Sequence, residues 1–195
     1  MHAHGPWQIL KSHDVYRDAW LHVRKDDVLR PDGKPGTHSA VFLRPGVSVL
    51  ALGADRQVFL TEEFHYAVGR VTLEVVSGGR EADELPLVAA RRELEEELGI
   101  QADEWTALGT IDPFTTMLNG PADLFLARGL HFGETRLDAT EQIRCVSVDF
   151  LEAVQMVQDG RITHAPSCTL ILKVALWLQQ HDPKVVQGMF PLPGI

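Results

Sequence analysis

Residues 78–100 read GGREADELPLVAARRELEEELGI, and this stretch decides the fold of the chain. Gly78 and Gly79 predict a turn, because glycine adopts backbone conformations that other residues avoid. Pro86 suits the first turn of a helix, and Gly99 suits the position just after a helix ends. The stretch therefore predicts a loop that leads into a helix between Pro86 and Gly99.

The predicted helix carries crowded carboxylates. Glu93 and Glu97 lie one turn apart, and Glu96 falls beside them. Like-charged neighbours destabilise a helix by roughly a few tenths of a kcal/mol each. We expect no compensating base at this turn, so a divalent cation would relieve the repulsion. Mg²⁺ suits the site because it accepts a few carboxylates together with phosphate oxygens, and the alternative is an acidic, solvated helix face.

The order of residue types in this stretch is similar to the Nudix box. The box reads Gly-x5-Glu-x7-Arg-Glu-U-x-Glu-Glu-x-Gly-U, with U aliphatic, and residues 78–100 match every specified position. The resemblance implies a Nudix hydrolase that cleaves the diphosphate of a nucleoside diphosphate linked to another group. It also implies Mg²⁺ as the cofactor, with Mn²⁺ as a possible substitute.

The same resemblance assigns roles to individual residues. It implies that Glu93, Glu96 and Glu97 bind the metal, together with the backbone carbonyl of Ser77. Arg92 would pair with Glu84 to hold the loop against the helix, and the catalytic set would comprise Glu96, Arg92, Glu84 and an activator of water. In relatives that activator is usually a Glu on a later loop, which makes Glu141 the candidate here and Glu134 the second choice. A solvent-exposed loop carboxylate is the competing interpretation of Glu141.

Composition narrows the class of protein. The 195 residues suit one domain, or one domain with a small appendage, and 45% of them are hydrophobic. The net charge of −9 argues against nucleic acid as a partner, and no stretch is apolar enough to span a membrane. The first residues do not resemble a secretory signal. Cys145 and Cys168 lie far apart without metal-type spacing, so we expect thiols in a reducing compartment and a cytoplasmic protein.

The remaining pattern predicts an α/β (α+β) fold. Residues 1–46 alternate β-prone runs with turns and predict a small antiparallel sheet, residues 47–182 the Nudix domain, and residues 183–195 a tail. Residues 71–77 predict one short strand that delivers the chain to the box. Helical spacing recurs at residues 149–159 and 166–181. We expect an α/β/α sandwich, in which a mixed sheet has helices on both faces.

Outside the box, roughly residues 14–180 resemble the ADP-ribose pyrophosphatase branch of the family. The matching segments are Pro31-Asp32-Gly33, LTEEFHYAVGRVTLEVVSGG at residues 60–79, and DGRI at residues 159–162. The resemblance implies a homodimer, because in that branch the N-terminal strands pair two subunits and both subunits line each substrate site. It also implies that ADP-ribose is cleaved to AMP and ribose 5-phosphate.

Two segments depart from that branch. Glu63 and His65 stand where relatives commonly have Gln and Arg, and residues 112–120 replace a Pro-Ser-Pro-Gly segment. Both regions help recognise the distal sugar phosphate in relatives, so we expect activity on more than one nucleoside diphosphate sugar. GDP-mannose, NADH and diadenosine polyphosphates remain alternative substrates. A non-catalytic nucleotide-binding module is the alternative of a different class.

Aromatic and basic residues complete the predicted substrate site. Trp20, Phe64 and Tyr66 are candidates for stacking on a base, although such residues in β-runs more often lie in a core or an interface. Guanidinium groups suit phosphate oxygens, with surface solubility as the competing explanation. The basic candidates are His65, Arg24, Arg44 and Arg70.

Overall fold

The computed structural model describes residues 1–137 and 142–187, which form two compact units. The N-terminal unit comprises Met1–Pro45 and Asp112–Pro121, and the larger unit comprises Gly46–Ile111 and Ala122–Ile195. Within the described ranges, no helix has the length and apolar character needed to cross a bilayer. The division of the sequence into residues 1–46, 47–182 and 183–195 stays a prediction.

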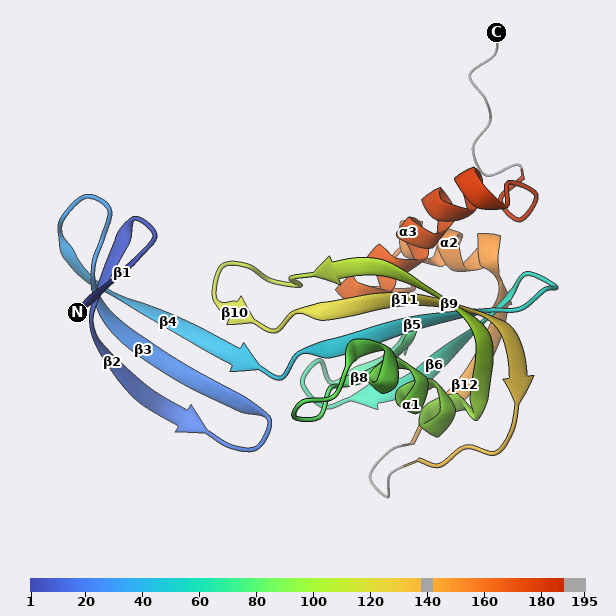
Figure 1. Cartoon of the computed structure of the whole chain (residues 1–195), viewed down its shortest axis with the longest axis horizontal. Helices are drawn as coiled ribbons and strands as arrows, with labels where there is room; N and C mark the ends of the chain where they lie inside the picture. Colours follow the sequence, from blue (N-terminus) through green and yellow to red (C-terminus); the bar gives the residue numbers. More distant parts are fainter. Residues whose placement is uncertain (138–141, 188–195) are drawn as a thin grey trace, which may run out of the picture. The chain divides into compact units, whose positions relative to one another are not determined.

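The N-terminal unit is built on a sheet with the order β1-β2-β3-β4-β10 (Figure 1). Its strands are β1 (His2–His4), β2 (Trp7–Arg17), β3 (Leu21–Leu29), β4 (Pro35–Leu43) and β10 (Leu118–Asn119). The first four strands are antiparallel, as predicted, and Gly33 adopts a φ of 77° in the turn between β3 and β4. β10 was not predicted; it follows the box in sequence and pairs in parallel with β4.

The larger unit contains a mixed sheet with the order β12-β6-β5-β11-β9, with β7 paired to β6 and β8 to β5. Its strands are β5 (Gly46–Leu52), β6 (Gln57–His65), β7 (Arg70–Glu74), β8 (Val76–Gly79), β9 (Ile100–Ile111), β11 (Ala122–Phe132) and β12 (Arg144–Asp149). β5 and β11 are parallel, whereas the other pairings are antiparallel.

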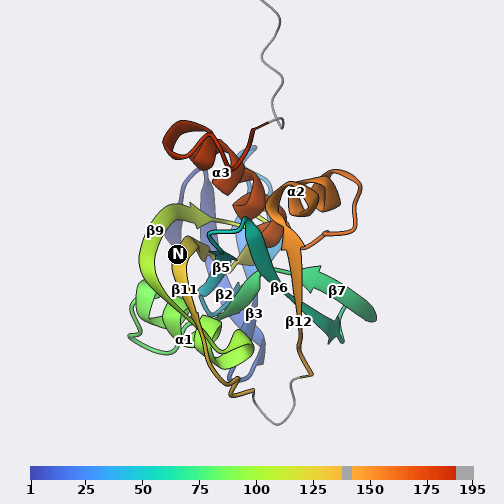
Figure 2. The same cartoon turned by 90° about the vertical axis from the view of Figure 1, so that its right-hand side faces the viewer.

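Helices cover both faces of this sheet, which confirms the α/β/α sandwich. The helix α1 (Pro86–Leu98) lies on one face, and α2 (Phe150–Gln158) and α3 (Ala165–His181) lie on the other (Figures 1 and 2). β5 is buried on both sides because its side chains alternate between the layers. Val49 packs in the cluster that contains residues of α1, whereas Leu50 packs with residues of α2 and α3.

The single strand predicted over residues 71–77 is wrong. The chain forms β7, which pairs with β6, and then β8, which pairs with β5, so it changes partners at Val75. Val75 packs with the α2 and α3 cluster and Val76 with the α1 cluster. A β-prone run reveals extended backbone but not which strand lies beside it, so this change of partner was not visible in the sequence.

Candidate active site

The helix α1 is defined by the residues that the sequence singled out at its ends. Pro86 occupies the first turn, where its missing N–H costs nothing, and Gly99 ends the helix in the left-handed conformation with a φ of 63°. A Cβ atom on Gly99 would lie 2.6 Å from the backbone oxygen of Gly133. Glycine is therefore required at this position both by its backbone angle and by the close approach of the later segment.

Arg92 joins the loop to the helix. Its Nε donates to Oε1 of Glu84 and its Nη2 donates to Oε2, both at 3.0 Å. The same Nη2 lies 3.1 Å from the backbone oxygen of Gly79. Bidentate guanidinium–carboxylate pairs are strong and directional, and the hydrogen bond from Arg92 lowers the pKa of Glu84. The loop of residues 79–84 is thus tied to α1 through one side chain.

Arg92 also reaches the acidic turn. Its Nη1 donates to Oε1 of Glu93 at 2.8 Å and to Oε2 of Glu96 at 3.1 Å. The expectation that this turn lacks a compensating base is therefore wrong. Arg92 and Glu96 have the i,i+4 spacing at which helical side chains face each other, so this base could have been predicted from the sequence. The contact with the adjacent Glu93 could not, because neighbouring side chains on a helix do not face each other unless a long one bends back. The carboxylates raise the pKa of Arg92 further, so its guanidinium stays charged.

Glycine at position 78 brings the loop backbone against the helix. A Cβ atom built on Gly78 would overlap the carboxylate of Glu93, so no other residue fits without moving that side chain. Gly78 belongs to β8, where it pairs with Val47. The preceding residue, Ser77, has its hydroxyl 2.9 Å from that of Ser48. The structure therefore places the backbone next to Ser77 beside one of the predicted metal ligands.

The carboxylates of Glu93, Glu96 and Glu97 are chemically suited to Mg²⁺, although their side chains do not converge on one point. Glu97 is buried with 8% exposure, and the side chains of Glu93 and Glu96 are 12% and 38% exposed. Among the described residues, no three His, Cys, Asp or Glu side chains already converge in a way that would hold a metal. Glu93 and Glu96 are turned toward the cationic Arg92 instead. Oxygen donors of this kind fit the preference of Mg²⁺ once they turn from the guanidinium.

The predicted activator of water lies outside the described residues, because Glu141 falls in the range 138–141. The chain approaches that range along α1, where the N–H of Arg136 donates to the backbone oxygen of Glu96 at 2.8 Å. Glu134 is exposed, and its backbone lies against the Cα of Gly99 at the end of the helix.

The β6–β7 hairpin holds four of the predicted substrate residues. Phe64 and Tyr66 are 57% and 95% exposed, so neither belongs to the core of this chain. Arg70 is exposed and donates from Nη2 to the hydroxyl of Thr163 at 2.8 Å. His65 is half-buried and has its Nε2 3.2 Å from Oε1 of Glu74.

The other predicted aromatic and basic residues lie in the N-terminal unit. Trp20 is 70% exposed, and the guanidinium carbon of Arg44 lies 5.2 Å from the centre of its ring. Arg24 stacks over Phe42 at 4.8 Å and pairs with Asp26 at 3.0 Å. The exposed ring of Trp20 offers a planar surface for a ligand ring, whereas Phe42 is half-buried.

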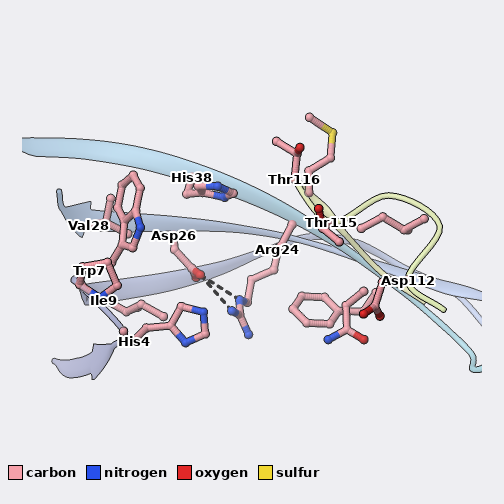
Figure 3. A pocket seen from close by; sticks show the side chains of 17 residues that line it. His4, Trp7, Ile9, Arg24, Asp26, Val28, His38, Asp112, Thr115 and Thr116 are labelled. Atoms are coloured by element: carbon pink, nitrogen blue, oxygen red, sulfur yellow. Dashed lines mark hydrogen bonds and ion pairs between the residues drawn. The ribbon is translucent and has the colours of Figure 1, made fainter. Parts of the chain in front are cut away.

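A pocket of about 690 Å³ opens within the N-terminal unit (Figure 3). The sheet contributes Arg24 and Asp26 to its lining, and the segment before β10 contributes Thr115 and Thr116. Asp26 is buried, and its Oδ1 has no hydrogen-bond partner within the described part of the chain. Asp112 and residues 115–119 therefore help line a pocket with a buried acceptor that sequence reasoning missed.

Sequence reasoning also missed Glu74. This residue ends β7, is 9% exposed and contacts both His65 and His164. A carboxylate on a strand flanked by apolar residues was the available signal, since a buried carboxylate requires partners. His164 is distant in sequence, so the pairing itself could not be predicted.

Two family models match the chain. The model described as "NUDIX domain" matches residues 42–164. The model described as "Nucleoside diphosphate sugar hydrolase N-terminal domain" matches residues 7–41.

Several characterised proteins are similar to the chain over most of its length. An ADP-ribose pyrophosphatase of Bacillus subtilis is 28% identical over 177 residues, which cover 88% of this chain and 96% of that protein. A methanol dehydrogenase activator of Bacillus methanolicus is 26% identical over 173 residues, covering 88% and 92%. A CMP-5'-(N-acetyl-N-hydroxy-3-aminopropyl)phosphonate hydrolase of Streptomyces rubellomurinus is 29% identical over 174 residues, covering 87% and 82%.

A solved structure shares the fold. The crystal structure of an ADP compounds hydrolase matches with a TM-score of 0.79 and covers 93% of this chain and 99% of that one. The two sequences are 20% identical, so this likeness establishes the architecture alone.

Proposed function

The chain belongs to the NUDIX family, and from that premise we propose that this hydrolase cleaves nucleoside diphosphate sugars with Mg²⁺ and accepts ADP-ribose. The observation that carries the proposal is the position of Arg92 between Glu84 and the acidic turn of Glu93 and Glu96. The guanidinium of Arg92 contacts the loop carboxylate of Glu84 and the helix carboxylates of Glu93 and Glu96, and this arrangement supports the proposal. The name of the Bacillus subtilis relative supports ADP-ribose as one substrate.

Each box residue then has a separate task. Arg92 and Glu84 keep the loop on α1, so the backbone at Ser77 stays beside Glu93. Glu93, Glu96 and Glu97 would hold the metal with the carbonyl of Ser77, and Mn²⁺ could replace Mg²⁺ there. When bound, the metal neutralises diphosphate oxygens and lowers the pKa of water.

The hydrolytic step consumes one water. The oxygen of water bonds to one phosphorus while the bridging P–O bond breaks, so ADP-ribose gives AMP and ribose 5-phosphate. Glu141 would orient that water and accept its proton. Arg92 stays charged throughout and holds no proton in transfer.

We expect the protein to discriminate only weakly among substrates that differ in the group beyond the diphosphate. The segment of residues 112–120 differs from the Pro-Ser-Pro-Gly type, and a site that lacks matched polar contacts rejects analogues weakly. The Streptomyces rubellomurinus relative is named for a CMP-linked phosphonate, which shows that related proteins serve different compounds. We therefore expect ADP-ribose to be accepted together with other nucleoside diphosphate sugars.

A substrate panel with product identification tests the proposal. The values of kcat/KM for ADP-ribose, ADP-glucose, GDP-mannose and NADH are measured side by side in Mg²⁺, and the products are identified by mass spectrometry. Hydrolysis in isotopically labelled water shows which phosphorus is attacked. A preference for ADP-ribose above about a thousandfold over the other compounds would contradict loose selection. If the protein hydrolyses none of the compounds in the panel, catalysis itself is contradicted and a nucleotide-binding module is favoured.

A further inference from the structure

Glu74 is held by more partners than an ordinary strand residue. Its Oε1 accepts a hydrogen bond from the Thr72 hydroxyl at 2.6 Å and lies 3.2 Å from Nε2 of His65. Its Oε2 lies 2.9 Å from Nδ1 of His164. Burial raises the pKa of Glu74, but the hydrogen bonds from His164 and Thr72 and the nearby histidines outweigh burial and lower it. The carboxylate is therefore ionised and acts only as an acceptor.

The ionised carboxylate of Glu74 determines which ring nitrogen of His164 carries a hydrogen. Nδ1 of His164 must be an N–H, because an unprotonated nitrogen facing Oε2 would place two acceptors in contact. The same Nδ1 lies 2.8 Å from the hydroxyl oxygen of Ser167. That oxygen in turn accepts the backbone N–H of Val75 at 3.0 Å. His164 and Ser167 thus hold both the side chain of Glu74 and the backbone of the next residue.

Val75, which these contacts hold, lies three residues before Gly78, the first residue of the box. The backbone oxygen of Val75 accepts a hydrogen bond from the Ser77 hydroxyl at 3.1 Å. Gly78 follows, and its Cα lies against the carboxylate of Glu93. Val75 is where the chain leaves β6 for β5, so no continuous strand pairing fixes its position. Contacts from the start of α3 supply that restraint.

Two other roles for this cluster fail on geometry. Ser167 is fully buried, and it meets His164 through the same Nδ1 that faces Glu74. A nucleophilic triad needs the serine and the carboxylate on different ring nitrogens. Nor does the cluster meet the requirements of a metal site within the described residues.

We propose that Glu74, His164 and Ser167 form a positioning cluster that fixes the backbone of residues 75–78 for the box. The cluster touches neither substrate nor metal and acts through Val75, Ser77 and Gly78. Its consequence for metal binding rests on the proposed function, whereas its effect on the backbone does not. Partners behind metal ligands commonly contribute about 10–100-fold to metal affinity.

Replacing His164 in two ways separates positioning from packing. In His164→Asn, the side-chain amide places an N–H near the position of Nδ1, whereas His164→Leu removes the donor. The matched control is His131→Leu, because Nε2 of His131 also lies 2.9 Å from a carboxylate, that of Asp103, but both side chains are exposed. Amide hydrogen exchange over residues 75–79 and Mn²⁺ affinity by electron paramagnetic resonance are measured for each variant.

We expect His164→Leu to speed amide exchange over residues 75–79 about tenfold and to weaken Mn²⁺ binding about tenfold. His164→Asn should restore most of both properties, and His131→Leu should alter neither. If His164→Leu does not fold, Ser167→Ala replaces it, because it removes the hydroxyl that accepts the Val75 N–H and contacts Nδ1 of His164 while keeping His164 itself. Unchanged exchange over residues 75–79 in the leucine or alanine variant overturns the proposal, as does an asparagine variant that behaves like the leucine one.

The two proposals fail in different ways. A wild-type protein that hydrolyses no compound of the panel, while His164→Leu still speeds exchange at residues 75–79, contradicts the proposed function and leaves the positioning cluster standing. A wild-type protein that hydrolyses ADP-ribose, with exchange and Mn²⁺ affinity unaffected in His164→Leu, contradicts the cluster alone.

Discussion

Replacing Arg92 by lysine keeps the positive charge but removes the fork that grips Glu84. A lysine ammonium cannot make both parallel bonds to the carboxylate and also reach Gly79 and the acidic turn. At least two charge-assisted hydrogen bonds are lost, each contributing about 1.5 kcal/mol. The Arg92 and Glu84 side chains are 27% and 11% exposed, so solvent recovers part of this loss. We expect Arg92→Lys to lower the free energy of unfolding by about 2 kcal/mol.

Arg144 offers a matched control for this substitution. It forms the same fork with Glu62, at 2.9 and 2.6 Å, but its side chain is 67% exposed. Urea unfolding followed by tryptophan fluorescence measures the variants Arg92→Lys and Arg144→Lys. The first should also lower the melting temperature by about 4–8 °C, and the second should leave it nearly unchanged. Equal losses in the two variants would refute the claim that the Arg92 fork holds the loop.

Three further outcomes are expected. Glu97→Gln removes charge without changing volume, so kcat should fall by orders of magnitude while the fold stays intact. The control Glu95→Gln, on the same helix, should keep a kcat near that of the wild type. Near-wild-type turnover of Glu97→Gln at saturating Mg²⁺ would show that Glu97 is not a metal ligand. The pKa of Glu74 in the folded protein lies below its ordinary value of 4.5. The wild type should therefore be more stable than Glu74→Gln above pH 4.5 and should lose this advantage as the pH falls through the folded pKa. A difference in unfolding free energy between the two proteins that does not change with pH in chemical denaturation would contradict this prediction. Edge strands of the N-terminal sheet favour pairing, so light scattering should detect a homodimer, and a fully active monomer at micromolar concentration would exclude that.

Local sequence determined the part of the site that lies within one loop and one helix. Pro86 and Gly99 set the ends of α1 because each residue's own backbone restrictions favour those positions. Residues 93, 96 and 97 share a face because helical spacing requires it. The largely apolar run of β5 is buried between two helical layers, since a strand with apolar residues on both sides must be covered twice.

Tertiary structure decided what depends on contacts between distant segments. β10 pairs with β4 although the whole box lies between them in the sequence. Glu74 contacts His164 only because α3 begins beside the end of β7. Arg92 and Glu96 meet at the i,i+4 spacing that a helix predicts, whereas the contacts of Arg92 with Glu84 and Glu93 reflect which of several acceptors this long side chain reaches. Such choices depend on the free energy of the assembled surroundings, which residue spacing does not contain.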